Sequence, residues 1–215
     1  MSTSSTAIGK SRVIIGAGDM LDIAWHAWSG VPGEGPVGRL EISQAADYSF
    51  DFGVFERISP SQTALFVAFD ERFGNFKRME IMQAAMDRGF HLASVIAAGA
   101  NVAPDAKIGA NAFVGAGAVI GSAVVIDYNV VVNAGAIVGF GARLKASCWI
   151  EGGVVLGNQV QIGAHATLRA GVVVTHGVKV GRHCEIGVPG LYRKDVVSKT
   201  VFDPRYDEPI VVHGG

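Results

Sequence analysis

Every sixth residue from position 96 to position 186 is a large aliphatic residue, without an exception or an insertion. Four positions after each of them stands a small or apolar residue, most often Ala, Val or Cys. Aliphatic residues make up well under half of an ordinary chain, so this regularity does not arise by chance. The aliphatic register is Ile96, Val102, Ile108, Val114, Ile120, Ile126, Val132, Val138, Leu144, Ile150, Leu156, Ile162, Leu168, Val174, Val180 and Ile186.

A period of six fits neither an α-helix nor a single strand. One large and one small inward residue in every six is typical of a parallel β-helix, whose short strands meet at tight corners. The repeat resembles the hexapeptide left-handed β-helix, in which three hexads form one triangular coil of eighteen residues. Residues eighteen apart are then expected to stack about 4.8 Å from each other. The handedness is implied by the resemblance, because the period does not reveal it.

The two cysteines fall on small inward positions of this register. Cys148 and Cys184 lie two coils apart with Ala166 between them. At roughly twice the 4.8 Å strand spacing they are too far apart to form a disulfide. We therefore predict two buried free thiols.

Composition changes near residue 95 and divides the chain. Most Phe and Met residues and two of the three Trp residues precede this point, whereas Gly, Ala and Val dominate after it. We predict a small α/β domain over residues 11–95, a β-helix over 96–191 and a C-terminal tail over 192–215. The tail lacks the G-x-P-A ending that is common in hexapeptide-repeat proteins, which leaves its role open.

Charge and hydropathy exclude several classes of function. The 18 basic and 19 acidic residues nearly cancel, and no Lys/Arg run appears, so nucleic acid and anionic membrane surfaces are not expected partners. The start "MSTSSTAIGK" has no apolar core of a signal peptide, and no apolar run approaches the roughly 20 residues that span a bilayer. We expect a cytoplasmic protein.

The N-terminal part is predicted to be Rossmann-like, that is, nucleotide-binding-like. A strand at 12–15, a glycine turn and a helix form an opening βα unit. Further strands are expected at 37–43, 63–70 and 91–96, with a helix at 73–90. Parallel sheets of this kind bind ligands at the carboxyl ends of their strands. The substrate-binding residues predicted there are Gly16, Ala17, Gly18, Asp19, Met20, Phe69 and Asp70.

Two interpretations of the glycine loop stay open. Gly16 and Gly18 provide the start of G-x-G-x-x-G, but Leu21 replaces the third glycine. The two glycines therefore indicate either a ligand loop or only a tight turn. His26 and His91 lie on element faces and are interpreted as packing or surface residues.

The segments "VIIGAGDMLDIA", "LFVAFDERFGNFKRMEIMQAAMDRGFHLASVI" and "GVPGLYRKDV", together with the hexads between the last two, resemble a sugar acyltransferase family. Its members are bacterial sialic acid O-acetyltransferases and UDP-4-amino-sugar N-acetyltransferases. The resemblance covers about residues 12–196. It implies a homotrimer, an N-terminal domain that binds a nucleotide-sugar, and acetyl-CoA or another acyl-CoA along the β-helix between subunits.

The chain departs from this family at its catalytic positions. The family carries an Asn, a His seven residues later that acts as general base, and a second His nine residues after that. Asn133 is present here, but the two histidine positions are Phe140 and Trp149. A third position, often His in the family's glycine loop, is Met20. A phenyl ring cannot accept a proton, so the usual base is missing.

Other histidines offer partial alternatives. His176 lies two coils beyond Phe140 and is either a displaced base or a corner residue. His165 and His183 stack in adjacent coils, but a metal site would need a third ligand, which the sequence does not offer. A γ-class carbonic anhydrase needs three histidines with a different spacing and is not favoured.

Two functions follow from these observations. The first is an acyl-CoA-dependent acyltransferase of a nucleotide-linked amino sugar or a similar small acceptor, with Asn133 and His176 as catalytic candidates. The second is a trimeric binding or scaffold protein that has lost the transfer chemistry. Small residues of the later coils also suit the fold itself. By resemblance, the acyl-CoA groove comprises Asn158, Gly163, Ala164, Gly181 and Lys194, with Arg182 or Arg193 as further phosphate ligands.

Overall fold

The computed structural model describes residues 11–32 and 35–212; the Ser/Thr-rich start lies outside them. The N-terminal domain contains a four-stranded parallel sheet in the order β2-β1-β3-β4, as the alternation of strands and helices predicted. Its elements are β1 (Ser11–Gly16), α1 (Gly18–Ser29), β2 (Val37–Glu41), the 3₁₀ helices η1 (Phe52–Arg57), η2 (Pro60–Gln62) and η3 (Arg72–Asn75), β3 (Thr63–Ala68), α2 (Phe76–Asp87) and β4 (His91–Leu92).

One predicted strand is wrong in detail. The segment 91–96 is not one strand but two, because β4 pairs with β3 of the N-terminal sheet and β5 (Val95–Ile96) pairs with the β-helix. The helix predicted over 73–90 begins at Phe76, after η3, and ends at Asp87. Both changes occur where the chain passes between the two domains or along their boundary.

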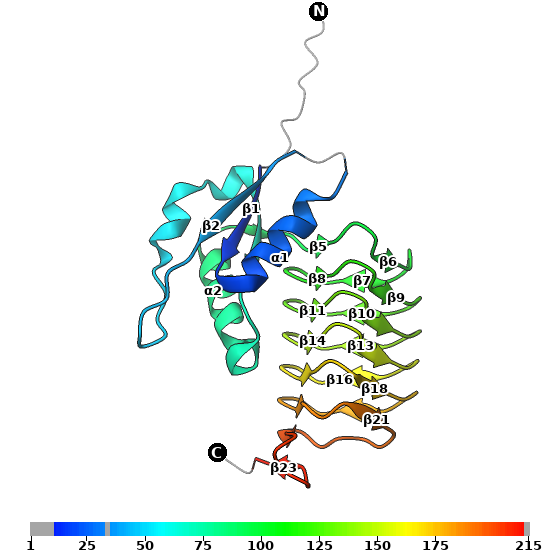
Figure 1. The fold of residues 1–215 in the computed structure, drawn as a ribbon. Coiled ribbons are helices and arrows are strands. Elements are labelled where there is room, and N and C mark those ends of the chain that lie inside the picture. Colours follow the sequence, from blue (N-terminus) through cyan, green and yellow to red (C-terminus); the bar gives the residue numbers. More distant parts are fainter. Residues whose placement is uncertain (1–10, 33–34, 213–215) are drawn as a thin grey trace, which may run out of the picture.

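The second half is a parallel β-helix of two-residue strands joined by four-residue turns, seen as a stack of coils in Figure 1. Each strand pairs in parallel with the strand eighteen residues on, as Val131 does with Trp149. The strands are β6 (Asn101–Val102), β7 (Lys107–Ile108), β8 (Phe113–Val114), β9 (Val119–Ile120), β10 (Val125–Ile126), β11 (Val131–Val132), β12 (Ile137–Val138), β13 (Arg143–Leu144), β14 (Trp149–Ile150), β15 (Val155–Leu156), β16 (Gln161–Ile162), β17 (Thr167–Leu168), β18 (Val172–Val174, three residues), β19 (Lys179–Val180) and β20 (Glu185–Ile186).

Parallel stacking continues into the C-terminal residues. The strand β21 (Gly190–Tyr192) pairs with β18, and β22 (Thr200–Phe202) pairs with β20. The last strand, β23 (Ile210–Val211), pairs with β22 in the antiparallel direction. The tail therefore adds to the stack of coils.

The six-residue register forms the core of the β-helix. Its aliphatic residues from Val114 to Ile186 are buried, together with the small or apolar residues of the second register from Ala118 to Cys184. The first three aliphatic residues are the exceptions, because Val102 and Ile108 are only partly buried and Ile96 is 39% exposed. Ile96 lies in the first coil, and no strand precedes β5 in its sheet. Both cysteines are buried and free, as predicted, and burial raises the pKa of the Cys148 thiol to about 12.

The β-helix has three walls that differ in their outward residues. The covered wall (β5, β8, β11, β14, β17, β20, β22 and β23) packs against the N-terminal domain through Phe113, Val131 and Trp149. The apolar wall (β6, β9, β12, β15, β18 and β21) exposes residues such as Val119 and Ile137. The polar wall comprises β7, β10, β13, β16 and β19 and presents Lys107, Arg143 and Lys179.

A buried polar network joins α2 to the β-helix. The guanidinium of Arg78 is fully buried and donates hydrogen bonds to the carbonyl oxygens of Val67, Asn129 and Asn111 at 3.0, 2.9 and 2.7 Å. The side chain of Asn111 donates to that of Asn129 at 3.0 Å, and the side chain of Asn129 donates to that of Ser147 at 2.9 Å. These three residues occupy equivalent positions in successive coils, so the network extends along the β-helix. Arg78 thereby fixes the N-terminal domain on the covered wall.

Within the described residues, no helix is long and apolar enough to cross a bilayer.

Candidate active site

The loops at the carboxyl ends of β1 and β3 lie side by side. The N–H of Ala17 donates to the carbonyl oxygen of Ala68 at 3.1 Å. A Cβ atom on Gly16 would lie 1.6 Å from that oxygen, and Gly18 has a φ of +62°, so the backbone requires or strongly favours glycine at both places. The tight-turn interpretation thus accounts for both glycines, and the same turn leaves Asp19 exposed in the first turn of α1.

The predicted substrate-binding residues divide into exposed and buried members. Gly18 and Asp19 are exposed, whereas Met20 is 3% and Phe69 2% exposed. The Phe69 ring packs edge-on against Phe50, with 5.2 Å between ring centroids. Buried apolar rings and thioethers stabilise the core and present no surface to a ligand. Among the predicted residues, the surface at this edge therefore comes from Gly18 and Asp19 and from the partly exposed Ala17 and Asp70.

Two of the three departures from the family pattern lie in one apolar cluster. Met20 and Trp149 are both buried in the cluster between α1 and the covered wall. Phe140 lies elsewhere, at a corner between the apolar and polar walls, and is 51% exposed. The apolar character of Met20 and Trp149 is thus explained by domain packing, whereas packing does not explain Phe140.

Asn133 begins a column of polar residues, which we call the Asn133 corner, where the chain leaves the covered wall. Asn133, Glu151 and Arg169 follow β11, β14 and β17 in successive coils. The Asn133 amide donates to the carbonyl oxygen of Ile150 at 3.2 Å. This column lies beside Glu71, which belongs to the loop after β3 in the N-terminal domain.

Arg169 joins three carboxylates at this corner. Its guanidinium donates to Glu71 and Glu151 at 2.7 Å each and to Glu185 at 2.9 Å. Burial alone raises the pKa of Glu71, but the hydrogen bond and charge of Arg169 outweigh burial and lower that pKa below 4.5. No pattern in the sequence indicated this group. The eighteen-residue spacing of Glu151 and Arg169 was readable, but Glu71 is 98 positions from Arg169.

The Phe140 corner contains the other catalytic candidate. Ser122, Phe140, Asn158 and His176 occupy equivalent turn positions in successive coils between the apolar and polar walls. The side-chain oxygen of Asn158 accepts the N–H of Phe140 at 3.0 Å, which gives Asn158 a structural role. His176 is exposed, and Lys194 lies next in the column because Val174 pairs with Tyr192.

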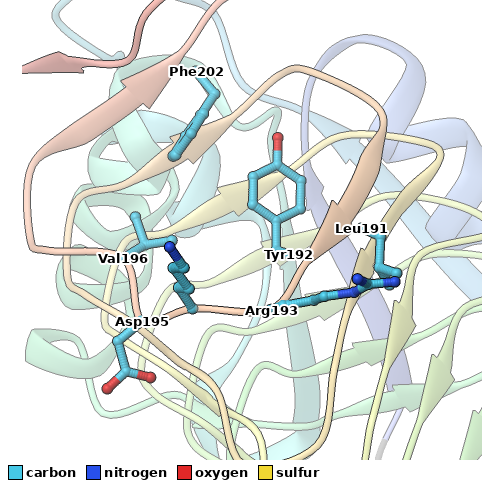
Figure 2. A pocket seen from close by; sticks show the side chains of 7 residues that line it. Leu191, Tyr192, Arg193, Asp195, Val196 and Phe202 are labelled. Atoms are coloured by element: carbon cyan, nitrogen blue, oxygen red, sulfur yellow. The ribbon is translucent and has the colours of Figure 1, made fainter.

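An open cavity of about 420 Å³ lies at the end of this column. Figure 2 shows Tyr192 in the centre of the lining residues, Phe202 to its upper left, and Arg193 beside Leu191. The Tyr192 hydroxyl donates to the carbonyl oxygen of Val188 at 2.7 Å, which holds the ring in place. Two rings and two cations suit a ligand with both apolar and anionic parts. The cavity is lined by Leu191, Tyr192, Arg193, Lys194, Asp195, Val196 and Phe202.

The remaining predicted cofactor residues lie at a third corner, between the polar and covered walls. Gly163, Ala164 and Gly181 are there, on the other side of the polar wall from Asn158 and Lys194. A Cβ atom would lie 2.4 Å from a backbone nitrogen of the next coil at both glycines. Coil stacking therefore requires these glycines, whether or not a ligand binds beside them.

The histidine pair at this third corner stacks on α2. His165 lies 4.1 Å from the Phe76 ring and 5.2 Å from the His183 ring, in nearly parallel planes. Its Nδ1 lies 2.8 Å from the carbonyl oxygen of Gly74. Burial, followed by the charges of His165, Arg182 and Lys199, lowers the pKa of His183. Among the residues that the structure covers, no three His, Cys, Asp or Glu side chains are arranged so that they could hold a metal ion.

Comparison with known proteins finds a hexapeptide-repeat family model and structures of sugar N-acetyltransferases. Residues 141–176 match the family model of the bacterial transferase hexapeptide (six repeats). Crystal structures of perosamine N-acetyltransferase from Caulobacter crescentus, in complex with CoA and GDP-perosamine, are 28% identical with a TM-score of 0.78. The match covers 91% of this chain and 93% of that chain. The resemblance to the sugar acyltransferase family is confirmed.

A second likeness concerns the family fold alone. The acetyltransferase domain of PglB from Neisseria gonorrhoeae, in complex with acetyl coenzyme A, is 24% identical with a TM-score of 0.64. The match covers 94% of this chain and the whole of that chain. The assignment of a left-handed β-helix rests on these structures. No curated protein sequence matches the chain.

Proposed function

We propose that the protein is an acyl-CoA-dependent acyltransferase that modifies the amino group of a nucleotide-linked sugar. The observation that carries this proposal is the likeness to perosamine N-acetyltransferase, which spans both domains at a TM-score of 0.78. That enzyme was crystallised with CoA and with GDP-perosamine, a nucleotide-linked amino sugar. A chain that retains both domains retains a place for an acceptor and a place for an acyl donor.

The acceptor is proposed to lie at the edge formed by Gly18, Asp19 and Asp70. The N–H groups at the exposed N-terminus of α1 attract a phosphate there, whereas the carboxylate of Asp19 in the same turn opposes it. In the reaction the amine nitrogen bonds to the thioester carbonyl carbon, and the bond from that carbon to sulfur breaks. CoA leaves as the thiolate, which takes up the proton lost by the amine, directly or through water. Asn133 and His176 remain the candidate groups that orient the reactants or carry that proton.

A missing base does not prevent this chemistry. A neutral amine is itself a good nucleophile, and holding it beside the thioester supplies much of the rate. Phe140 therefore fits an amine acceptor better than a hydroxyl acceptor, which needs a base to remove its proton. This difference favours N-acylation over O-acylation.

The acyl-CoA is proposed to bind along the Phe140 corner toward the cavity beside Tyr192, in a groove between subunits, so that its thioester meets the acceptor of a neighbouring subunit. Lys194 and Arg193 supply positive charge for CoA phosphates, and the rings of Tyr192 and Phe202 supply apolar surface. Asn158 lies on this path. Gly163, Ala164 and Gly181 lie across the polar wall and would contact the same molecule only if it wraps around that wall or binds between two subunits.

A homotrimer is proposed for the assembled protein. On the apolar wall, Val119, Ile137 and Leu191 are 39%, 43% and 50% exposed, and they lie in one column of outward positions. A row of exposed aliphatic side chains on a flat wall marks an interface. Hexapeptide-repeat proteins are typically trimers. As the sequence predicts, the protein is expected to act in the cytoplasm.

Calorimetric titration with acetyl-CoA, and separately with GDP- and UDP-linked 4-amino sugars, tests the proposal. Micromolar binding of acetyl-CoA, followed by CoA release in the presence of one amino sugar, would support it. The Asn133→Ala and His176→Ala variants then show which group contributes to turnover, with His91→Ala, an exposed histidine of β4, as the control. Absence of acetyl-CoA binding, with or without an amino sugar, would exclude the proposed activity.

The second candidate, a binding or scaffold protein of the same fold, is favoured by Phe140. Because Phe140 is exposed, Phe140→His restores the family's base position at little cost in folding, whereas Trp149→His disturbs a packed cluster. Transfer that appears only in Phe140→His would support the scaffold function. Robust turnover by the wild-type protein would exclude it.

A further inference from the structure

The contact between Arg169 and Glu71 is an ionic link between the two domains, next to the proposed acceptor edge. Glu71 directly follows Asp70 in the chain. Arg169 and its other two partners, Glu151 and Glu185, belong to the β-helix. We call this four-residue group the Arg169 clasp.

Contacts within the β-helix hold Arg169 in position independently of Glu71. Glu151 lies one coil before Arg169, and its second carboxylate oxygen accepts the N–H of Ala170 at 2.9 Å. Glu185 receives two donors of the guanidinium, Nε at 3.2 Å and Nη2 at 2.9 Å. With these bonds in place, Nη1 is directed at both Glu151 and Glu71. A planar fork of donors suits this arrangement, which the single ammonium of Lys cannot reproduce.

The charges of the clasp indicate a positional role. One guanidinium faces three carboxylates, so two negative charges have no cation within the group. Without the guanidinium, the three carboxylates would repel one another, and Glu71 would move away from the coil. The Arg169 side chain is 31% and the Glu71 side chain 27% exposed, so water screens these charges only in part.

We propose that Arg169 is a positioning residue for the acceptor. By holding Glu71, it fixes the loop 69–72 of the proposed acceptor edge against the Asn133 corner, where Asn133 stands two coils before Arg169. This inference rests on the proposed function, because it assumes that the acceptor binds at that loop. A displaced loop moves the amine away from the thioester, and transfer depends steeply on that distance.

Steady-state kinetics of Arg169→Gln test the inference. We expect kcat/KM for the amino-sugar nucleotide to fall about tenfold or more, with KM for acetyl-CoA unchanged within about twofold. Arg169→Lys should be intermediate, and Glu71→Gln should reproduce most of the loss. The matched control is Lys145→Gln, which removes an ion pair with Asp127, 3.6 Å apart, that lies wholly within the β-helix. A loss of folded enzyme would lower the apparent kcat and leave both KM values unchanged, whereas a positioning role raises KM for the acceptor alone.

Hydrogen exchange provides a readout that does not need activity. In Arg169→Gln, peptides covering residues 69–76 should take up deuterium at least about twice as fast, with unchanged exchange in the coils around Lys145. The positioning role would be overturned by unchanged hydrogen exchange in residues 69–76. It would also be overturned by equal increases in KM for the amino-sugar nucleotide and for acetyl-CoA. If the wild-type protein transfers no acyl group, the proposed function fails, while the exchange measurement still decides whether Arg169 holds the loop.

Discussion

The covered wall and the apolar wall of the β-helix have the same interior and different exteriors. Both place an aliphatic residue inward in every coil, as Val132 does on one and Val138 on the other. Outward, Phe113 and Trp149 are buried beneath α1, whereas Ile137 is 43% exposed. The inward residues thus specify the coil, and the outward residue of each short strand specifies what covers the wall. Function in this fold is encoded on the outside of the repeat.

The largest effect is expected where the covered wall meets α2. Replacing Arg78 by Met leaves the carbonyl oxygens of Asn111 and Asn129 buried without their donor. Each such loss costs about 1–3 kcal/mol, so we expect the free energy of unfolding to fall by about 3–5 kcal/mol in urea denaturation. Arg143→Met, on the exposed polar wall, is the control and should change stability by less than about 0.5 kcal/mol. Equal effects of the two variants would show that the polar network does not secure the domain.

The next effect concerns assembly through the apolar wall. A charge at Ile137 would be buried without a partner in the proposed trimer, so Ile137→Glu should dissociate it. Sedimentation equilibrium should give three times the chain mass of 22.4 kDa for the wild type and a single chain mass for the variant. Val125→Glu places the same charge on the polar wall and should leave the trimer intact. A monomeric wild type, or a trimer that only Val125→Glu dissociates, would show that the apolar wall is not the trimer interface.

Much of the fold could be predicted because the contacts of the β-helix join residues that are close in the sequence. Its register depends on spacings of six and eighteen residues, and the structure buries those residues from Val114 onward. The prediction is least accurate at the ends. Ile96 is exposed because the first coil has no preceding neighbour, and the segment 91–96 divides between two sheets.

The candidate site was less predictable because it depends on contacts between the domains. From the sequence, Trp149 was interpreted as a lost catalytic histidine, whereas the structure shows it packed beneath α1. Similarly, no local pattern relates Glu71 to Arg169, 98 positions later. Residue type indicates chemistry, but only the docking of the two domains shows which chemistry is available to a substrate.

A smaller effect is expected from acid at the third corner, where α2 rests on the histidine stack. The groups that face His183 are His165, Phe76, Arg182 and Lys199, and the pKa of His183 is lowered below 6.5. The fold therefore favours the neutral ring. Its stabilising contribution is complete above pH 6.5 and declines as the pH falls through the lowered pKa. We expect Tm to fall by no more than about 2 °C from this group, because the ring is only half-buried.

The His183→Gln variant isolates this contribution. Its Tm should depend less on pH between 7.5 and 5.5 than that of the wild type, whereas His91→Gln, on exposed β4, should retain the wild-type dependence. A steeper pH dependence in His183→Gln would mean that the charged ring is favoured in the fold, opposite to the direction expected from its surroundings.

The smallest effect is expected inside the β-helix, at the two thiols. Cys148 is fully buried with its pKa raised to about 12, and burial also raises the pKa of Cys184. Since the thiolate is the reactive form, iodoacetamide at pH 8 should label neither residue in the native protein and both in urea. With time Cys184 should react first, because it lies nearer the end of the stack, where local opening is easier. Faster labelling of Cys148, measured by mass spectrometry, would instead locate the weakest part of the β-helix beneath the N-terminal domain.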